Sequence, residues 1–142
     1  MEYSIDKEAL KDKVIKEISR FAAGAHADDG SSLFDAYKIL SRDLATILDY
    51  IEGGVSAICV RLIDISSKED NKIIFDIPDF IPSMEGPAKE ELDRYIVYNA
   101  CWQWIEDKAA AEGNPYKQRA DEALANANIL LKTRKSPKSY KK

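Results

Sequence analysis

The chain has 142 residues, of which 45% are hydrophobic and 32% charged, and this length and composition predict one folded domain and exclude the disordered class. Residues 132–142 contain six of the 21 basic residues and no acid, so the other 15 basic and 25 acidic residues give residues 1–131 a charge of −10 against +6 for this C-terminal tail. The first residues carry acids instead of a basic, apolar leader, and no apolar run approaches the roughly 20 residues of a membrane span, so we expect neither export by a signal peptide nor contact with a membrane.

Apolar residues at spacings of three and four predict a first helix over about residues 6–23. Ser4 or Asp6 is the expected N-cap, and Gly24 is the expected C-cap. The predicted buried stripe consists of Leu10, Val14, Ile18 and Phe21. The first helix is therefore expected to be amphipathic, with one face towards the core.

The polar residues 25–32 predict a loop, and residues 33–40 predict a short turn of helix. Ser41 is the expected N-cap of a second long helix. Its stripe consists of Leu44, Ile47, Leu48, Ile51, Val55, Ile58, Cys59 and Leu62. This stripe keeps its phase through Gly53 and Gly54, which favours one helix with a kink or a close backbone contact over two helices, although a broken helix stays possible.

Residues 72–77 predict a short strand, which ends at Pro78 because proline cannot donate to a ladder. A lone strand has two unpaired edges. Residues 63–65 can pair with it in a hairpin if the second helix ends early, and otherwise the strand needs a partner from another subunit. The sequence leaves both pairings open.

The segment 92–105 is rich in aromatic residues, has few helix breakers and predicts a third long helix. Its apolar side chains cover most of the circumference, so it is either the central helix or has a second buried face in an assembly. Asn114 and Pro115 predict the start of a last helix, whose alanine-rich stripe ends at Leu131.

These elements predict a mainly α, four-helix, bundle-like fold with a short strand or hairpin between the second and third long helices. Residues 1–131 are expected to form a single helical domain, and residues 132–142 a flexible basic tail. No internal repeat or interdomain linker divides the sequence.

Residue types that carry chemistry are few and lack partners at the required spacing. His26, the sole histidine, lies in a loop beside Asp28 and Asp29, where a solvated loop is the favoured interpretation. Cys59 and Cys101 have no second cysteine or histidine at metal-ligand spacing, which favours buried thiols in a reducing compartment over a disulfide. We expect no catalytic residue, no metal site and no cofactor, and hence a protein that is not an enzyme.

Two groups of residues are better candidates for contacts with other molecules. Tryptophan is enriched at interface anchor points, and a strand that lacks a partner can pair across subunits. The predicted interface residues are Trp102, Trp104, Tyr98, Ile73 and Phe75. An unopposed basic run can bind phosphates or an acidic protein surface. The predicted contacts to such an anionic partner are Lys132, Arg134, Lys135, Lys138, Lys141 and Lys142.

The order of these elements resembles that of small prophage-encoded virion proteins of tailed bacteriophages, in particular the head–tail connector (adaptor) family that lies beneath the portal. The resemblance rests on Ser41-Arg42-Asp43-Leu44 at the start of a long helix, the strand Phe75–Pro78, the helix 95–105 and the last helix from Pro115 to Arg134. It covers most of residues 5–135. The chain departs from the family in its longer segment 24–40 and in its basic tail.

The resemblance implies a helical protein without enzymatic residues, which forms a homo-oligomeric ring through helix and strand contacts. It also implies portal or tail proteins as partners, a possible DNA contact through the tail, and a place in the virion or the bacterial host cytoplasm. A small nucleic-acid-binding or regulatory helical domain that uses the basic tail is the alternative. A small enzyme is the weakest alternative, because nothing in the sequence predicts a pocket with convergent polar groups.

Overall fold

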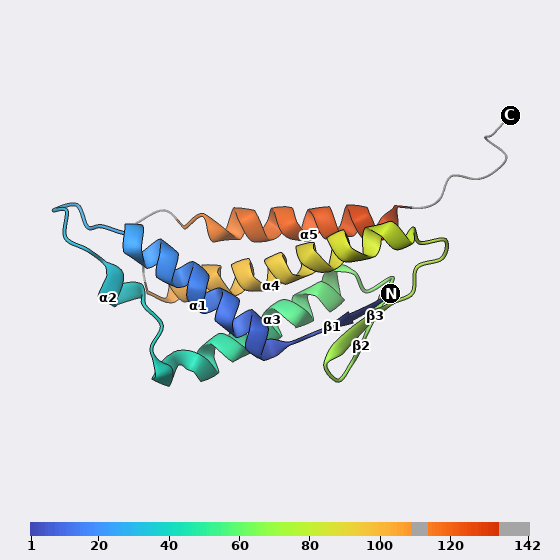
Figure 1. The fold of residues 1–142 in the computed structure, drawn as a ribbon, viewed down its shortest axis with the longest axis horizontal. Helices are drawn as coiled ribbons and strands as arrows, with labels where there is room; N and C mark the ends of the chain where they lie inside the picture. Colours follow the sequence, from blue (N-terminus) through green and yellow to red (C-terminus); the bar gives the residue numbers. More distant parts are fainter. Residues whose placement is uncertain (109–113, 134–142) are drawn as a thin grey trace, which may run out of the picture.

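Four long helices and one small sheet make up the part of the chain that the computed structural model describes, residues 1–108 and 114–133. The elements are β1 (Glu2–Ser4), α1 (Lys7–Gly24), α2 (Phe34–Tyr37), a 3-10 turn (Ser41–Asp43), α3 (Leu44–Arg61), β2 (Ser66–Glu69), β3 (Lys72–Phe75), a second 3-10 turn (Pro82–Met84), α4 (Glu85–Asp107) and α5 (Tyr116–Lys132). In Figure 1, α5 lies along α4, and the sheet lies at the opposite end from α2. The predicted mainly α fold, with a small sheet between the second and third long helices, is confirmed.

Helix α1 is amphipathic, as predicted. The Asp6 carboxylate accepts a hydrogen bond from the backbone N–H of Ala9 at 3.1 Å, so Asp6 and not Ser4 is the N-cap. The buried face consists of Leu10, Val14, Ile18 and Ala22. Phe21, predicted for the stripe, is partly buried and packs against the core, where its ring makes a T-shaped, edge-to-face contact with Tyr37.

Helix α3 is unbroken through its glycine pair, which confirms the single long helix. A Cβ atom built on Gly54 would lie 3.5 Å from the Ile96 Cα atom and 3.5 Å from the Asn99 amide nitrogen of α4, whereas one on Gly53 would meet nothing within 4 Å. Position 54 therefore faces α4 directly, with room for a Cβ atom at ordinary van der Waals distance but not for a long side chain without displacement of α4. The predicted cap at Ser41 is replaced by a 3-10 turn, in which the Asp43 carboxylate accepts from the Leu40 N–H at 2.9 Å.

The sheet is antiparallel with β3 in the centre, in the order β1-β3-β2. Tyr3 pairs with Ile73, and Ser66 pairs with Phe75, so both edges of the predicted strand find partners within the chain. The strand does form a hairpin with the segment before it, as one of the two predicted pairings required. The partner strand is Ser66–Glu69, however, and not residues 63–65. The strand therefore does not need a partner from another subunit, and β1 was not predicted at all.

Helix α4 is the central helix. Its buried residues are Ala88, Leu92, Tyr95, Ile96, Val97, Ala100, Cys101, Trp104 and Ile105. They point in several directions, because α1, α3 and α5 all pack against this helix. Helix α5 begins one residue later than predicted, with Pro115 at the N-cap, and the Asn114 side chain just before it accepts from the backbone N–H of Tyr116 at 3.2 Å. Small buried residues of α5, such as Ala120 and Ala127, bring that helix close to α4.

Substituting the two glycines of α3 is expected to have opposite effects. Gly54→Leu should lower the free energy of unfolding by about 2 kcal/mol, because the side chain must displace α4. The matched control, Gly53→Leu, should raise it by about 0.5–1 kcal/mol, since leucine is a better helix former and has open space. Urea unfolding followed by circular dichroism measures both. Equal losses would contradict the close approach at Gly54.

Stability is expected to fall at alkaline pH. Burial, followed by the hydrogen bond to Asp93 at 2.5 Å, raises the pKa of Tyr3 above its ordinary value of 10.0, and burial raises that of Tyr116 in the same direction. Above pH 10 the unfolded chain loses phenolic protons that the folded chain keeps. The free energy of unfolding should therefore be insensitive to these groups below that pH and fall above it, by about 1.4 kcal/mol per pH unit for each retained proton.

The variant Tyr3→Phe isolates one of these protons. It should lose about 1–2 kcal/mol at neutral pH with the hydrogen bond to Asp93, and its stability should fall less steeply above pH 10 than that of the wild type. Urea unfolding between neutral pH and pH 11 provides the comparison. An unchanged alkaline slope would show that folding does not raise the pKa of Tyr3.

Candidate interaction surface

Three of the five predicted interface residues belong to the core of this chain. The exposed fractions of Trp104, Ile73 and Phe75 are 3%, 0% and 2%. The Trp104 indole N–H donates to the backbone oxygen of Tyr37 at 2.6 Å, which satisfies its polar group inside the protein. These side chains meet neighbouring elements of the same chain, so this structure offers none of them to a partner, contrary to their predicted role.

The other two predicted interface residues, Tyr98 and Trp102, are half-buried on α4. The Tyr98 ring stacks on Tyr116 of α5, with 5.8 Å between ring centroids. The Lys117 ammonium lies 4.6 Å from the centroid of the Trp102 ring. Both aromatic side chains therefore contact α5 and expose only part of their surface.

Lys132 is the one residue of the predicted anion-binding group that lies within the described part of the chain. It is the last residue of α5, and its ammonium lies 3.5 Å from the Asp64 carboxylate in the turn after α3. The other predicted contacts, Arg134, Lys135, Lys138, Lys141 and Lys142, lie outside the described residues.

The residues considered for chemistry lie apart from one another. His26 is exposed, and its Nδ1 atom lies 3.1 Å from the backbone oxygen of Gly24. Cys59 and Cys101 are both free thiols, and burial raises the pKa of Cys101, which keeps that thiol protonated. Residues 1–108 and 114–133 contain no group of three histidine, cysteine or acidic side chains that could hold a metal ion. No helix in these two ranges is both long and apolar enough to cross a membrane.

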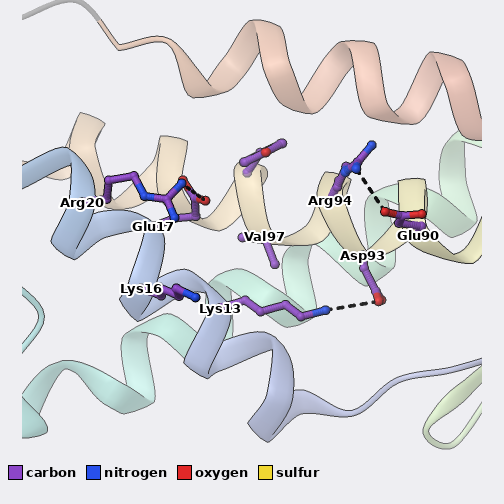
Figure 2. Close-up of a pocket in the computed structure, with 9 residues that line it drawn as sticks. Lys13, Lys16, Glu17, Arg20, Glu90, Asp93, Arg94 and Val97 are labelled. Atoms are coloured by element: carbon purple, nitrogen blue, oxygen red, sulfur yellow. Dashed lines mark hydrogen bonds and ion pairs between the residues drawn. The ribbon is translucent and has the colours of Figure 1, made fainter.

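A shallow groove of about 250 Å³ lies between α1 and α4 (Figure 2). It is lined by Lys13, Lys16, Glu17, Arg20, Glu90, Asp93, Arg94, Val97 and Tyr98. Its acids are already paired: Asp93 lies 3.6 Å from the ammonium of Lys13, Glu17 lies 3.4 Å from Arg20, and Glu90 lies 3.0 Å from Arg94.

Tyr3 also donates to Asp93, so this carboxylate holds two partners. The groove is lined by four cationic and three acidic side chains, so opposite charges nearly balance along it. The groove therefore resembles a solvated, charge-paired helix boundary more than a site prepared for acid–base chemistry or for anion binding.

Three aliphatic side chains are left in water at the C-terminal ends of two helices. Val60, Ile63 and Ile129 are exposed by 70%, 76% and 65%, and we call them the aliphatic patch. Among the described residues, the only other large apolar side chain classed as exposed is Phe34 in α2, at the far end of the molecule (Figure 1). Single exposed apolar residues are common, and a group of exposed aliphatic residues at the ends of α3 and α5 is a candidate contact surface.

The ion pair between Lys132 and Asp64 links the last residue of α5 to the turn after α3, the two chain segments that carry the aliphatic patch. Val60 and Ile63 lie one turn apart on and just after α3, and Ile129 lies one turn before Lys132 on α5. Sequence reasoning missed the patch because Val60 and Ile129 lie outside the predicted stripes. An aliphatic residue on the polar side of an amphipathic helix is itself a sign of a contact surface, and this sign was present in the sequence.

Neither a scan against protein-family models, nor a search of curated proteins, nor a search of solved structures finds a match to this chain. Function must therefore be argued from the surface of the molecule and from the order of its elements. The aliphatic patch is the feature of that surface that folding of the described residues leaves unexplained.

The aliphatic patch is expected to contribute little to the stability of the isolated chain. Ile63→Ser should change the free energy of unfolding by less than about 0.5 kcal/mol, because its side chain is already in water. Ile73→Ala, from a fully buried position, should cost about 2–5 kcal/mol. Denaturant unfolding at low protein concentration compares the two. A large loss for Ile63→Ser would mean that this residue serves folding instead of contact.

Proposed function

We propose that this chain is a non-enzymatic structural protein of a phage or prophage head–tail junction, which assembles into a ring and contacts portal or tail proteins in the virion or the host cytoplasm. The observation that carries this proposal is the aliphatic patch of Val60, Ile63 and Ile129. Burial of apolar surface is the main favourable term in protein association, at about 25 cal/mol for each Å² removed from water.

The order of elements supports the proposal. Helix α3, strand β3, helix α4 and helix α5 follow one another as in the connector family that the sequence resembles. The sheet is completed inside the chain, so a shared strand is not needed to close it. We therefore propose that subunits meet at the helix ends that carry the aliphatic patch, and not through β3 or Trp104.

The groove between α1 and α4 supports the non-enzymatic part of the proposal. Asp93, Glu17 and Glu90 each have a cationic partner within 3.6 Å, and these ion pairs are exposed to water. General acid–base chemistry needs a group whose pKa is tuned and whose proton faces a substrate. Paired carboxylates in a shallow groove do not provide one.

The basic residues from Lys132 onwards favour one alternative, a helical domain that binds nucleic acid. Such binding rests on phosphate contacts and weakens steeply with salt. It leaves the aliphatic patch in water, because aliphatic side chains gain nothing from phosphates. The two functions therefore differ in whether substitutions in the aliphatic patch matter.

Co-assembly with the portal protein encoded in the same genome tests the proposal. Mixed at micromolar concentration, the two proteins are expected to form a ring-shaped complex, visible by negative-stain microscopy and by light scattering after gel filtration. The double variant Ile63→Ser/Ile129→Ser should weaken this complex at least tenfold, since it removes two aliphatic contacts worth roughly 1–2 kcal/mol each.

The matched control is Phe34→Ser, which changes an exposed apolar residue in α2 and should leave the complex intact. A chain that stays monomeric with portal protein present would overturn the proposal. Binding of duplex DNA that is insensitive to the double variant, without any portal complex, would favour the nucleic-acid alternative instead.

A further inference from the structure

The three-stranded sheet is a small unit at one end of a helical molecule (Figure 1). Within the part of the chain that the structure describes, its strands approach one another closely, whereas close backbone approaches between strands and helices are few and lie mainly between β2 and α3. Structural units with a low density of contacts to the rest of a protein can unfold locally while the rest stays folded. The sheet has the arrangement of such a unit.

One face of the sheet is buried. Tyr3 of β1 pairs with Ile73 of β3, Phe75 lies two residues further along β3, and all three side chains belong to the core. Three short strands need a buried apolar face of this kind to be stable. The sheet therefore depends on its contact with the rest of the core, and any change that weakens this contact favours its unfolding.

Asp93 of α4 joins β1 to the helices. Its Oδ1 atom accepts from the Tyr3 hydroxyl at 2.5 Å, and its Oδ2 atom lies 3.6 Å from the Lys13 ammonium of α1. Hydrogen bonds to an ionised acceptor are stronger than those to a neutral one. Loss of the charge on Asp93 therefore weakens its contacts with both β1 and α1.

Glu52 of α3 joins β2 to the helices in the same way. One of its oxygens lies 4.0 Å from the Lys68 ammonium of β2, and the other is paired with Lys7, the first residue of α1. The hydrogen bond from Lys7, opposed in part by burial, holds the pKa of Glu52 below its ordinary value of 4.5. Glu52 therefore stabilises the folded state above pH 4.5, and this contribution is lost as the pH falls through its lowered pKa.

The other charged groups around these two carboxylates do not connect a strand to a helix in the described part of the chain. In the sheet, Lys72 lies 3.6 Å from Glu2 and 3.9 Å from Glu69, so these ion pairs are internal to it. The groove beside Asp93 belongs to α1 and α4, and its remaining charged residues are Lys16, Glu17, Arg20, Glu90 and Arg94.

We propose that the sheet is an acid-sensitive conformational switch, in which β1, β2 and β3 unfold together while the long helices stay folded. The charges of Asp93 and Glu52 determine how often this opening occurs. Acid removes both charges and favours the open form, which exposes the apolar face of the sheet to solvent. The switch is independent of the proposed function, so either can fail alone.

Native-state hydrogen exchange of the full-length protein, followed by NMR, tests the switch. The amide hydrogens of Ile5, Phe75 and Asp76 bridge the strands. At neutral pH they should share one opening equilibrium, at least tenfold more favourable than that of amides in the middle of α4. After correction for intrinsic exchange rates, this equilibrium should rise about fivefold more than that of α4 between pH 7 and pH 3.5.

Variants with matched controls identify the carboxylates. Asp93→Ala should raise the opening equilibrium of the sheet about tenfold at neutral pH, and Tyr3→Phe, which keeps the charge of Asp93, should raise it by a similar factor. Glu52→Gln should raise it about two- to fivefold and reduce its dependence on acid. The control is Glu90→Gln, which changes a carboxylate of α4 paired with Arg94 of the same helix and should not alter it.

Three results would overturn the inference. The first is exchange of the sheet amides with the same opening equilibrium as α4, which would show that the sheet unfolds only with the whole protein. The second is an effect of Glu90→Gln on the sheet as large as that of Asp93→Ala. The third is an unchanged acid dependence in Asp93→Ala/Glu52→Gln. Circular dichroism verifies that each variant is folded, and Tyr3→Phe tests the contact with β1 without any change of charge.

Discussion

Burial of most of the circumference of helix α4 is the constraint on which the other elements depend. Its apolar side chains point in several directions, so one partner helix cannot cover them. Helix α3 approaches through Gly54, α5 through its alanines, and α1 through its amphipathic face. Each fully buried aliphatic side chain contributes about 1.5–3 kcal/mol, so removing any of the three neighbours exposes a large part of the core.

Hydrogen bonds to side chains of α4 hold the sheet and the short helix α2 against it. Tyr3 of the sheet donates to Asp93, and Trp104 donates to the backbone of Tyr37 in α2. These bonds hold both ends of the molecule against α4 and leave its aromatic residues with neighbours inside the chain. Among the described residues, the aliphatic side chains most exposed to water are those of the aliphatic patch at the ends of α3 and α5, and this exposure is the basis of the proposed assembly through that place.

Helices could be predicted from the sequence because their signals are local. The Asp6 cap, the spacing from Leu10 to Ile18, and the Asn114 side chain that accepts from Tyr116 each act within one or two turns. Strand β1 could not be predicted, since three residues show no period and the strand exists only through its distant pairing with β3. The pairing of β3 itself was left open for the same reason.

The interface prediction was harder for a different physical reason. Apolar composition shows that a residue will be buried, but it does not distinguish a neighbour in the same chain from one in another chain. Trp104, Ile73 and Phe75 were predicted at an interface and lie in the core, while Val60 and Ile129 stand outside the stripes and are exposed. Hydrogen–deuterium exchange of the full-length protein, alone and in complex with portal protein, tests the central claim most directly. The account predicts slower exchange at residues 60–64 and 129–133, whereas slowing confined to Tyr98 and Trp102 would contradict it.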